Sequence, residues 1–117
     1  MRLEAKKYLF DVQQAAARIL EFTSGRQLED YQSNAMLRAA VERQFEIIGE
    51  ALAQLARLDE NLVAQISEHR RIIDFRNILI HGYAQVDSVA VWRTASGDLP
   101  ALRAAVAALL AELGETP

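Results

Sequence analysis

Apolar residues recur every three or four positions along most of the chain, which is the period of an α-helix. The first such stretch ends at Thr23-Ser24-Gly25, where the glycine can take the left-handed conformation that closes a helix. Its repeating apolar positions are Leu9, Val12, Ala16, Ile19 and Leu20. We see no strand-like alternation of polar and apolar residues, so the pattern predicts helices throughout.

After a short polar link, the pattern predicts one long second helix that turns Tyr31, Ala35, Phe45, Ile48, Leu52 and Leu55 toward the core. Further along, Asp59 or Asn61 can cap a short helix, and a helix through Ile72, Phe75 and Leu79 should end at Gly82. A short turn after Asp87 and a last helix, capped by Asp98 and closed by Gly114, complete the chain. We therefore predict a single domain over residues 1–117, an all-α, up-and-down bundle of four to five helices.

Composition narrows the function classes. The 13 Lys and Arg against 16 Asp and Glu give a net charge of −3, which argues against a broad basic surface that coats nucleic acid. The absence of cysteine excludes disulfides and thiolate chemistry, and two histidines are too few for a three-histidine metal centre. No signal peptide or membrane-length apolar run is evident, so we expect no membrane association and a cytoplasmic location.

One segment, Arg70–Tyr83 (RRIIDFRNILIHGY), carries candidate chemistry. Asn77 precedes His81 by one helical turn, so its amide can hydrogen-bond the imidazole, and a histidine suits acid–base catalysis near neutral pH. Arg76 lies five residues before His81, about 140° away around an ideal helix. The two side chains need not meet within one chain, and a symmetric dimer could bring two copies together. Arginine and histidine without a metal suggest RNA cleavage, in which the ribose 2′-OH is the nucleophile.

Plainer interpretations of the same residues stay open. Arg70 and Asp74 could form an ordinary ion pair, and His81 could be a helix cap. Glu46 and Glu50 lack a third metal ligand, so we predict no metal site there and expect either to pair with Arg43. His69 is interpreted as a solvated loop or helix-start residue, and Phe75 and Trp92 as aromatic residues of the core or of a dimer interface.

The motif Arg76-Asn77-x3-His81-x-Tyr83 resembles the R-x4-H-x-Y signature of HEPN toxins of the HepT type. Other segments match in the same order: Phe22-Thr23-Ser24-Gly25, residues 42–51 (ERQFEIIGEA), Val86-Asp87, Val91-Trp92 and Asp98-Leu99-Pro100. The resemblance implies a helical bundle that forms a homodimer, and a ribonuclease that needs neither metal nor cofactor. It implies a minimal nucleotidyltransferase as the cognate antitoxin.

By position, the resemblance makes Arg76 the phosphate-binding residue, His81 the acid–base group and Asn77 their support. Tyr83 would be the hydroxyl that the antitoxin AMPylates, which would place bulk and negative charge beside His81 and block RNA. Apart from the resemblance, Arg70 and Arg71 could extend an RNA-binding surface or form a plain solvated face. Residues 69–93 hold four arginines against two aspartates, so a small focused site is compatible with the acidic total.

The chain departs from the family in residues 66–75, which lack an I-P-W-like turn and have an acid, Asp74, in place of a small residue. This departure bears on substrate preference and activity level. Together with the acidic net charge, it motivates an alternative function: a catalytically weak HEPN dimer that chiefly binds and regulates its nucleotidyltransferase partner.

Overall fold

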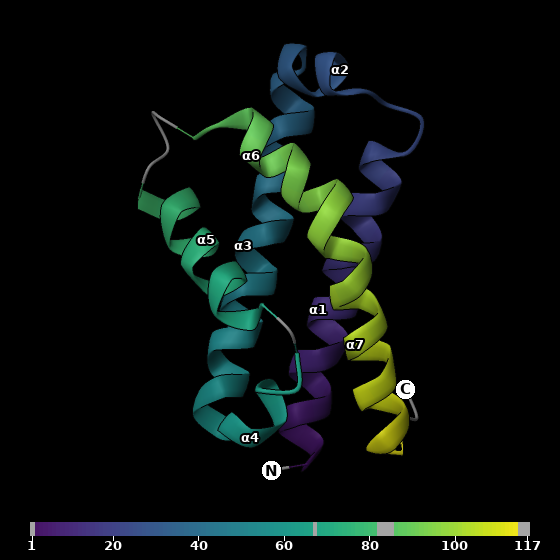
Figure 1. Ribbon diagram of the computed structural model, residues 1–117, viewed down its shortest axis with the longest axis vertical. Coiled ribbons are helices and arrows are strands. Elements are labelled where there is room, and N and C mark those ends of the chain that lie inside the picture. The colour runs from purple at the N-terminus through teal and green to yellow at the C-terminus, as the bar shows by residue number, and fades with distance from the viewer. Residues whose placement is uncertain (1, 67, 82–85, 115–117) are drawn as a thin grey trace.

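Four long helical segments run alternately up and down the molecule in the computed structural model, which describes residues 2–66, 68–81 and 86–114 (Figure 1). They are α1 (Arg2–Thr23), α3 (Ala35–Leu58), α5 (His69–His81) and a final segment of α6 (Ser88–Arg93), the π-helical η1 (Thr94–Asp98) and α7 (Leu99–Glu112). Short helices α2 (Leu28–Ser33) and α4 (Glu60–Val63) lie between them. No strand occurs in these described ranges, so the all-helical prediction is confirmed.

Side chains cap several of these helices and so fix where each begins. The Asn34 side chain accepts a hydrogen bond from the backbone N–H of Leu37, 3.0 Å away, at the start of α3. Asp59 caps α4 in the same way, which decides between the two caps predicted from the sequence. At the other ends, Gly25 and Gly114 adopt φ values of +72° and +70°, as their predicted roles after α1 and α7 require.

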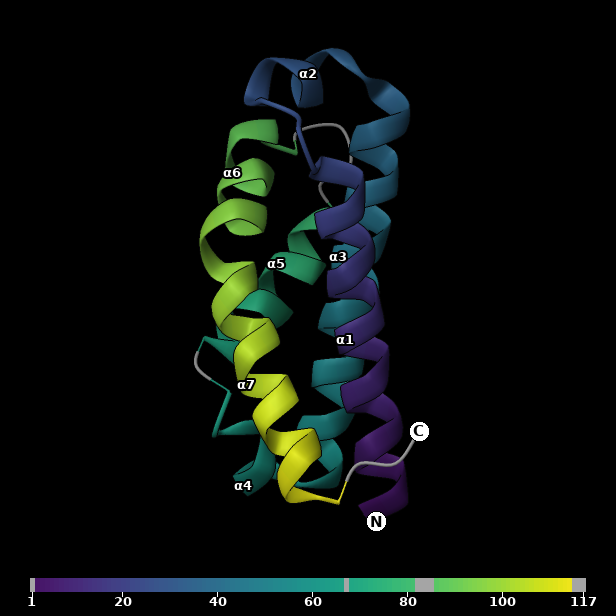
Figure 2. The same ribbon diagram turned by 90° about the vertical axis from the view of Figure 1, so that its right-hand side faces the viewer.

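Helix α3 is the centre of the bundle, because it packs against α1 on one side and α5 on another, while α7 lies along α1 (Figure 2). Most of the predicted apolar positions of α1 and α3 lie in this core, while Leu20 is half-buried at its edge. The fully buried residues include Leu9, Val12, Ala16, Ile19, Ile48, Leu52 and Leu55. The packing holds α5, which carries the candidate motif, on the outside of α3.

The predicted long second helix is wrong at its start. Asn34 has an extended backbone and separates α2 from α3, so Tyr31 lies on a helix of its own and Ala35 is exposed. Tyr31 is nevertheless buried, and its ring packs against Trp92 in a tilted arrangement with centroids 5.5 Å apart. The apolar spacing does not reveal this break, because α2 and α3 both turn an apolar face toward the same core.

The predicted cap at Asp98 is also wrong. Asp98 has helical backbone angles, and its side chain makes no cap hydrogen bond, because α6, η1 and α7 form one continuous helical stretch. The carboxylate instead pairs with Arg71 of α5. None of the described helices is long and apolar enough to cross a membrane.

Candidate active site

Helix α5 approaches α3 unusually closely at Gly49. A Cβ atom added to Gly49 would lie 2.3 Å from Cβ of Arg76 and 2.9 Å from its Cγ, far inside van der Waals contact. Only a glycine fits there, so the two helix backbones can come together at the point where Arg76 leaves α5. The stem of Arg76 is thus packed against α3, and its side chain is 20% exposed.

The Arg76 guanidinium is bound on two sides. Its Nε and Nη2 donate to Oδ1 of the neighbouring Asn77, at 3.1 and 2.6 Å. Its Nη1 donates to Oε1 of Glu50, the residue after Gly49, in an ion pair. These bonds use three of the five guanidinium N–H groups and leave one on each terminal nitrogen. Two N–H groups therefore remain to donate to the oxygens of a phosphate.

Glu50 is itself held in place. Its second oxygen, Oε2, accepts a hydrogen bond of 2.9 Å from Nε2 of Gln54, one turn further along α3. This hydrogen bond, together with the positive charges of Arg76 and Arg57, lowers the pKa of the Glu50 carboxyl. Glu50 is therefore a charged acceptor for Arg76 at neutral pH, although its side chain is 52% exposed.

His81 is the last residue of α5 and is exposed. Asn77 was predicted to hydrogen-bond His81, but its amide oxygen is occupied by Arg76 in this structure. Arg76 and Asn77 are thus brought together, while His81 lies further along the helix. Tyr83, the predicted modification site, and Gly82, the predicted helix end, lie outside the described residues.

The two candidate RNA-binding arginines differ in their surroundings. Arg70 is exposed. Arg71 pairs with Asp98 of the facing helix, and its Nε lies 3.7 Å from Oε1 of Glu68. Arg71 therefore joins α5 to the η1 segment, a structural task that the sequence did not indicate.

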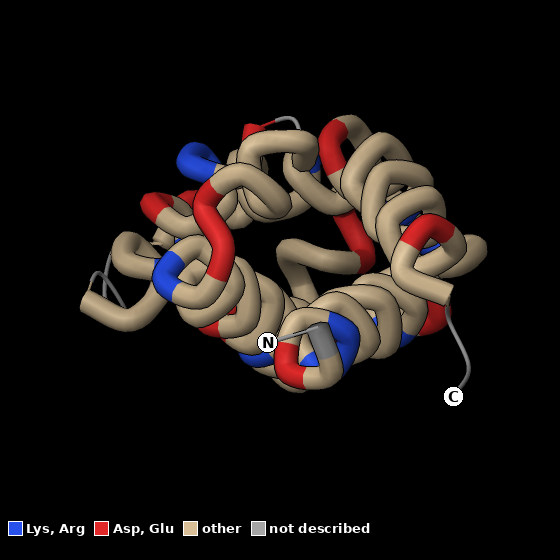
Figure 3. Tube along the Cα trace, turned by 90° about the horizontal axis from the view of Figure 1, so that it is seen from below, with Lys and Arg blue, Asp and Glu red and all other residues tan. Residues whose placement is uncertain are grey.

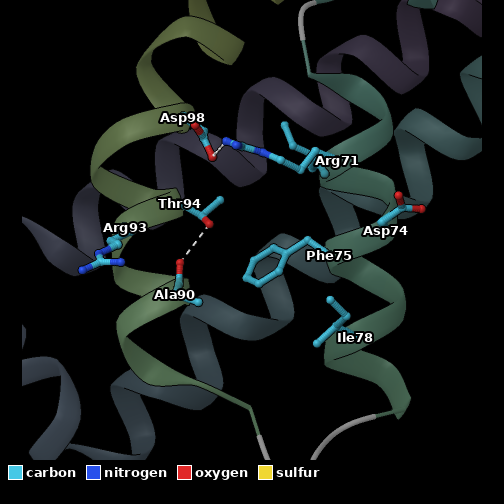
Figure 4. Close-up of a pocket in the computed structure, with 9 residues that line it drawn as sticks. Arg71, Asp74, Phe75, Ile78, Ala90, Arg93, Thr94 and Asp98 are labelled. Atoms are coloured by element: carbon cyan, nitrogen blue, oxygen red, sulfur yellow. Dashed lines mark hydrogen bonds and ion pairs between the residues drawn. The ribbon is translucent and has the colours of Figure 1, made fainter.

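A groove of about 430 Å³ lies between α5 and the stretch from α6 into η1. Phe75 and Ile78 project from α5 toward Ala90 and Thr94, and the pair of Arg71 and Asp98 spans the gap (Figure 4). Phe75 also packs edge-on against Phe45 with centroids 5.4 Å apart, so this half-buried ring contacts the core, while its predicted alternative role in a dimer interface stays a prediction.

Charges of both signs are interspersed around the helices rather than gathered by sign (Figure 3). Arg43 lies 3.3 Å from Glu46, which confirms one of the two pairings expected for it. In the part of the chain that the structure describes, no group of three or more His, Cys, Asp or Glu side chains could hold a metal ion.

Sequence reasoning missed Gly49, Glu50 and Gln54 as partners of the motif. From the sequence, Glu50 is a candidate partner of Arg43 and no metal ligand, and nothing in its own helix indicates a contact with Arg76. Helical spacing relates residues within one helix, but it does not say which residues of two separate helices meet. Two signals mark this position in the sequence: an interior glycine often marks a close approach, and Gly49 and Glu50 lie within residues 42–51, a segment that resembles the family.

A helical bundle that presents an oriented arginine and, five residues later, an exposed histidine has the groups needed to act on a phosphodiester. Residues 12–109 match the family described as ribonuclease HepT-like. The chain belongs to this ribonuclease family.

Similar proteins bear names that agree with this assignment. The chain is 35% identical over 103 residues to a "Probable ribonuclease HepT" of Thermococcus cleftensis, covering 88% of this chain and 93% of the relative. It is 30% identical over 100 residues to a "Putative RNase" of Methanocaldococcus jannaschii, covering 86% and 91%. A second protein of that organism, named "Gamma-glutamylcyclotransferase and putative RNase", is 30% identical over an aligned length of 119 positions, and the match covers 97% of this chain and 50% of that protein. No solved structure matches the chain significantly.

Proposed function

We propose that this protein is the toxin of a toxin–antitoxin pair, a homodimeric endoribonuclease that needs no metal and is silenced by AMPylation of Tyr83. The family assignment supports RNA cleavage, and the two free N–H groups of the bound Arg76 guanidinium supply the contact for the scissile phosphate. The proposal rests on this arginine, which is held by Asn77 and Glu50 and still has two N–H groups to donate.

In the proposed reaction, the ribose 2′-oxygen attacks the adjacent phosphorus as its proton passes to a base. The bond between O2′ and phosphorus forms, the bond to O5′ breaks, and an acid delivers a proton to O5′. The products are a 2′,3′-cyclic phosphate and a 5′-hydroxyl end. Arg76 stabilises the negative charge on the pentavalent phosphate, and His81 is the proton-transfer group.

The reaction needs both a base and an acid, and one chain supplies one exposed histidine near Arg76. The other histidine, His69, starts α5, about 18 Å from His81 along the axis, and its Nδ1 lies 3.0 Å from the Ile66 carbonyl oxygen. A second protomer therefore provides the second His81 in our proposal. A homodimer also lets the Arg76 of one protomer work beside the His81 of its partner.

Cleavage by purified protein in the presence of EDTA tests the enzymatic part. The wild type should cut RNA, while His81→Ala and Arg76→Ala should lose at least about 100-fold in rate and keep the helical circular-dichroism signal. Growth arrest on expression without the partner that is lost in Arg76→Ala would argue against the alternative of a regulatory HEPN dimer, whereas a wild type that neither cuts RNA nor arrests growth would favour that alternative.

A cognate minimal nucleotidyltransferase with ATP tests the regulatory part. Mass spectrometry should locate added AMP on Tyr83, and the modified toxin should no longer cut RNA. Tyr83→Phe should keep its toxicity when the partner is co-expressed. Modification of another residue, with Tyr83 unchanged, would refute its role.

A further inference from the structure

We propose that Glu50 is a positioning residue of the ribonuclease: it orients Arg76 for the phosphate without touching RNA itself. The proposal rests on the ribonuclease function proposed above and adds a residue that lies outside the R-x4-H-x-Y motif. It rests on two contacts of Glu50, which accepts a hydrogen bond from Gln54 through one carboxylate oxygen and from Arg76 through the other.

The geometry makes the position of Glu50 well defined. It follows Gly49, where α3 and α5 approach too closely for any Cβ, so its Cα is fixed relative to the Cα of Arg76. Both of its carboxylate oxygens have assigned partners, since Oε1 accepts from Arg76 and Oε2 accepts from Gln54. A carboxylate whose two oxygens both accept hydrogen bonds has little freedom to rotate. Because one of these hydrogen bonds comes from Arg76, rotation of the guanidinium is restricted as well.

Asn77 alone would not suffice to orient Arg76. Asn77 and Arg76 are neighbours on α5, so their hydrogen bonds fix the guanidinium relative to α5 alone. Glu50, on a second helix, accepts a hydrogen bond from Nη1, the one guanidinium nitrogen that does not donate to Asn77. Hydrogen bonds to two different residues, made by different nitrogens, set the plane of the guanidinium and the direction of its two remaining N–H groups.

The charge of Glu50 distinguishes positioning from RNA binding. A carboxylate beside the phosphate site repels RNA, so its removal should leave affinity unchanged or strengthen it. The loss should instead fall on turnover, because a misdirected Arg76 no longer meets the charge of the transition state. A residue that merely stabilised the fold would not separate turnover from affinity in this way.

The test compares Glu50→Ala and Glu50→Gln with Glu46→Gln, a matched control. Glu46 is also an α3 acid, one turn away, but it pairs with Arg43. Turnover is measured on an RNA oligonucleotide, and affinity on its 2′-O-methyl analogue, which cannot be cut. We expect kcat to fall about 10- to 100-fold in Glu50→Ala and less in Glu50→Gln, whose amide oxygen still accepts from Arg76. Affinity for the analogue should stay equal or tighten, and Glu46→Gln should match the wild type.

An NMR measurement separates this proposal from the ribonuclease proposal. In the wild type, the 15N signals of the Arg76 side chain should report slow guanidinium rotation, and Glu50→Ala should remove that restriction. Wild-type kcat in Glu50→Ala, or a loss confined to RNA affinity, would overturn the positioning role. If the wild type cuts no RNA, the ribonuclease proposal fails, and the NMR comparison alone decides: unchanged Arg76 signals in Glu50→Ala would refute the positioning role.

Discussion

The close approach at Gly49 gives the sharpest mutational prediction. In Gly49→Ala the new methyl group would start 2.3 Å from Cβ of Arg76, whereas ordinary contact begins at 3.4 Å. The obstructing atoms are the stem of Arg76 next to the α5 backbone, which cannot swing aside. Helix α5 must therefore move away from α3 by about 1 Å at this point.

The expected cost in stability is modest. Overpacking costs about 1–3 kcal/mol, while alanine in place of glycine in a helix interior recovers about 1 kcal/mol. The net loss of about 0–2 kcal/mol lowers Tm by up to about 8 °C, at about 4 °C per kcal/mol for a domain of this size. The expected cost in activity is larger, because a displacement of about 1 Å in the Arg76 guanidinium reduces turnover about 100-fold.

The assay is RNA cleavage beside thermal unfolding, with Gly97→Ala as the control. Gly97 lies in η1, and a Cβ added there meets nothing within 4 Å. Gly97→Ala should keep wild-type cleavage and an equal or higher Tm. If Gly49→Ala cuts RNA within two-fold of the wild-type rate, the helix approach does not position Arg76, and the reasoning is wrong.

Three further predictions concern other parts of the bundle. Arg71→Ala should lower the free energy of unfolding by about 0–1 kcal/mol and keep RNA cleavage, because the charge of Arg71 is already paired with Asp98. A large loss of RNA affinity in a filter-binding assay would instead make Arg71 an RNA contact. Asn34→Ala should cost about 1 kcal/mol in urea unfolding, since it removes the cap of α3, and an unchanged midpoint would contradict that role. Burial raises the pKa of the Glu42 carboxyl, so folding favours its protonated form, and wild-type stability should fall as pH rises through its unfolded and then its folded pKa. Glu42→Gln should therefore raise Tm at pH 7, and the gain should shrink below pH 4; no gain at pH 7 would count against burial as the cause.

The sequence predicts the helices well where one apolar face repeats without interruption. The end of α1, the cap at Asp59 and the end of α7 follow from residues whose local chemistry dictates the backbone. The two wrong helix boundaries, at Asn34 and at Asp98, have a common cause. Each residue can either cap a helix that begins there or bind another partner within a continuous helix. Asn34 does break the helix, and Asp98 does not, because Arg71 binds its carboxylate instead.

The candidate site was predictable only along α5. Helical spacing relates Arg76, Asn77 and His81, which share one helix, but it misassigned the amide of Asn77, which binds Arg76 rather than His81 in this structure. Adjacent residues on a helix diverge by about 100°, yet a long arginine can fold back to its neighbour. The contribution of Gly49 and Glu50 depends on how α3 and α5 pack, which no periodicity within one helix determines.

Analysis of the cleavage ends decides whether the protein cuts RNA through the ribose 2′-OH without a metal. One RNA oligonucleotide, its DNA counterpart and the same RNA with a single 2′-deoxyribose at the mapped scissile position are incubated with the protein in EDTA, and the products are examined by mass spectrometry. The account predicts that the RNA alone is cut at that position, leaving a 2′,3′-cyclic phosphate and a 5′-hydroxyl. Cleavage of the deoxy-substituted strand at the same bond, or products with a 5′-phosphate, would contradict it.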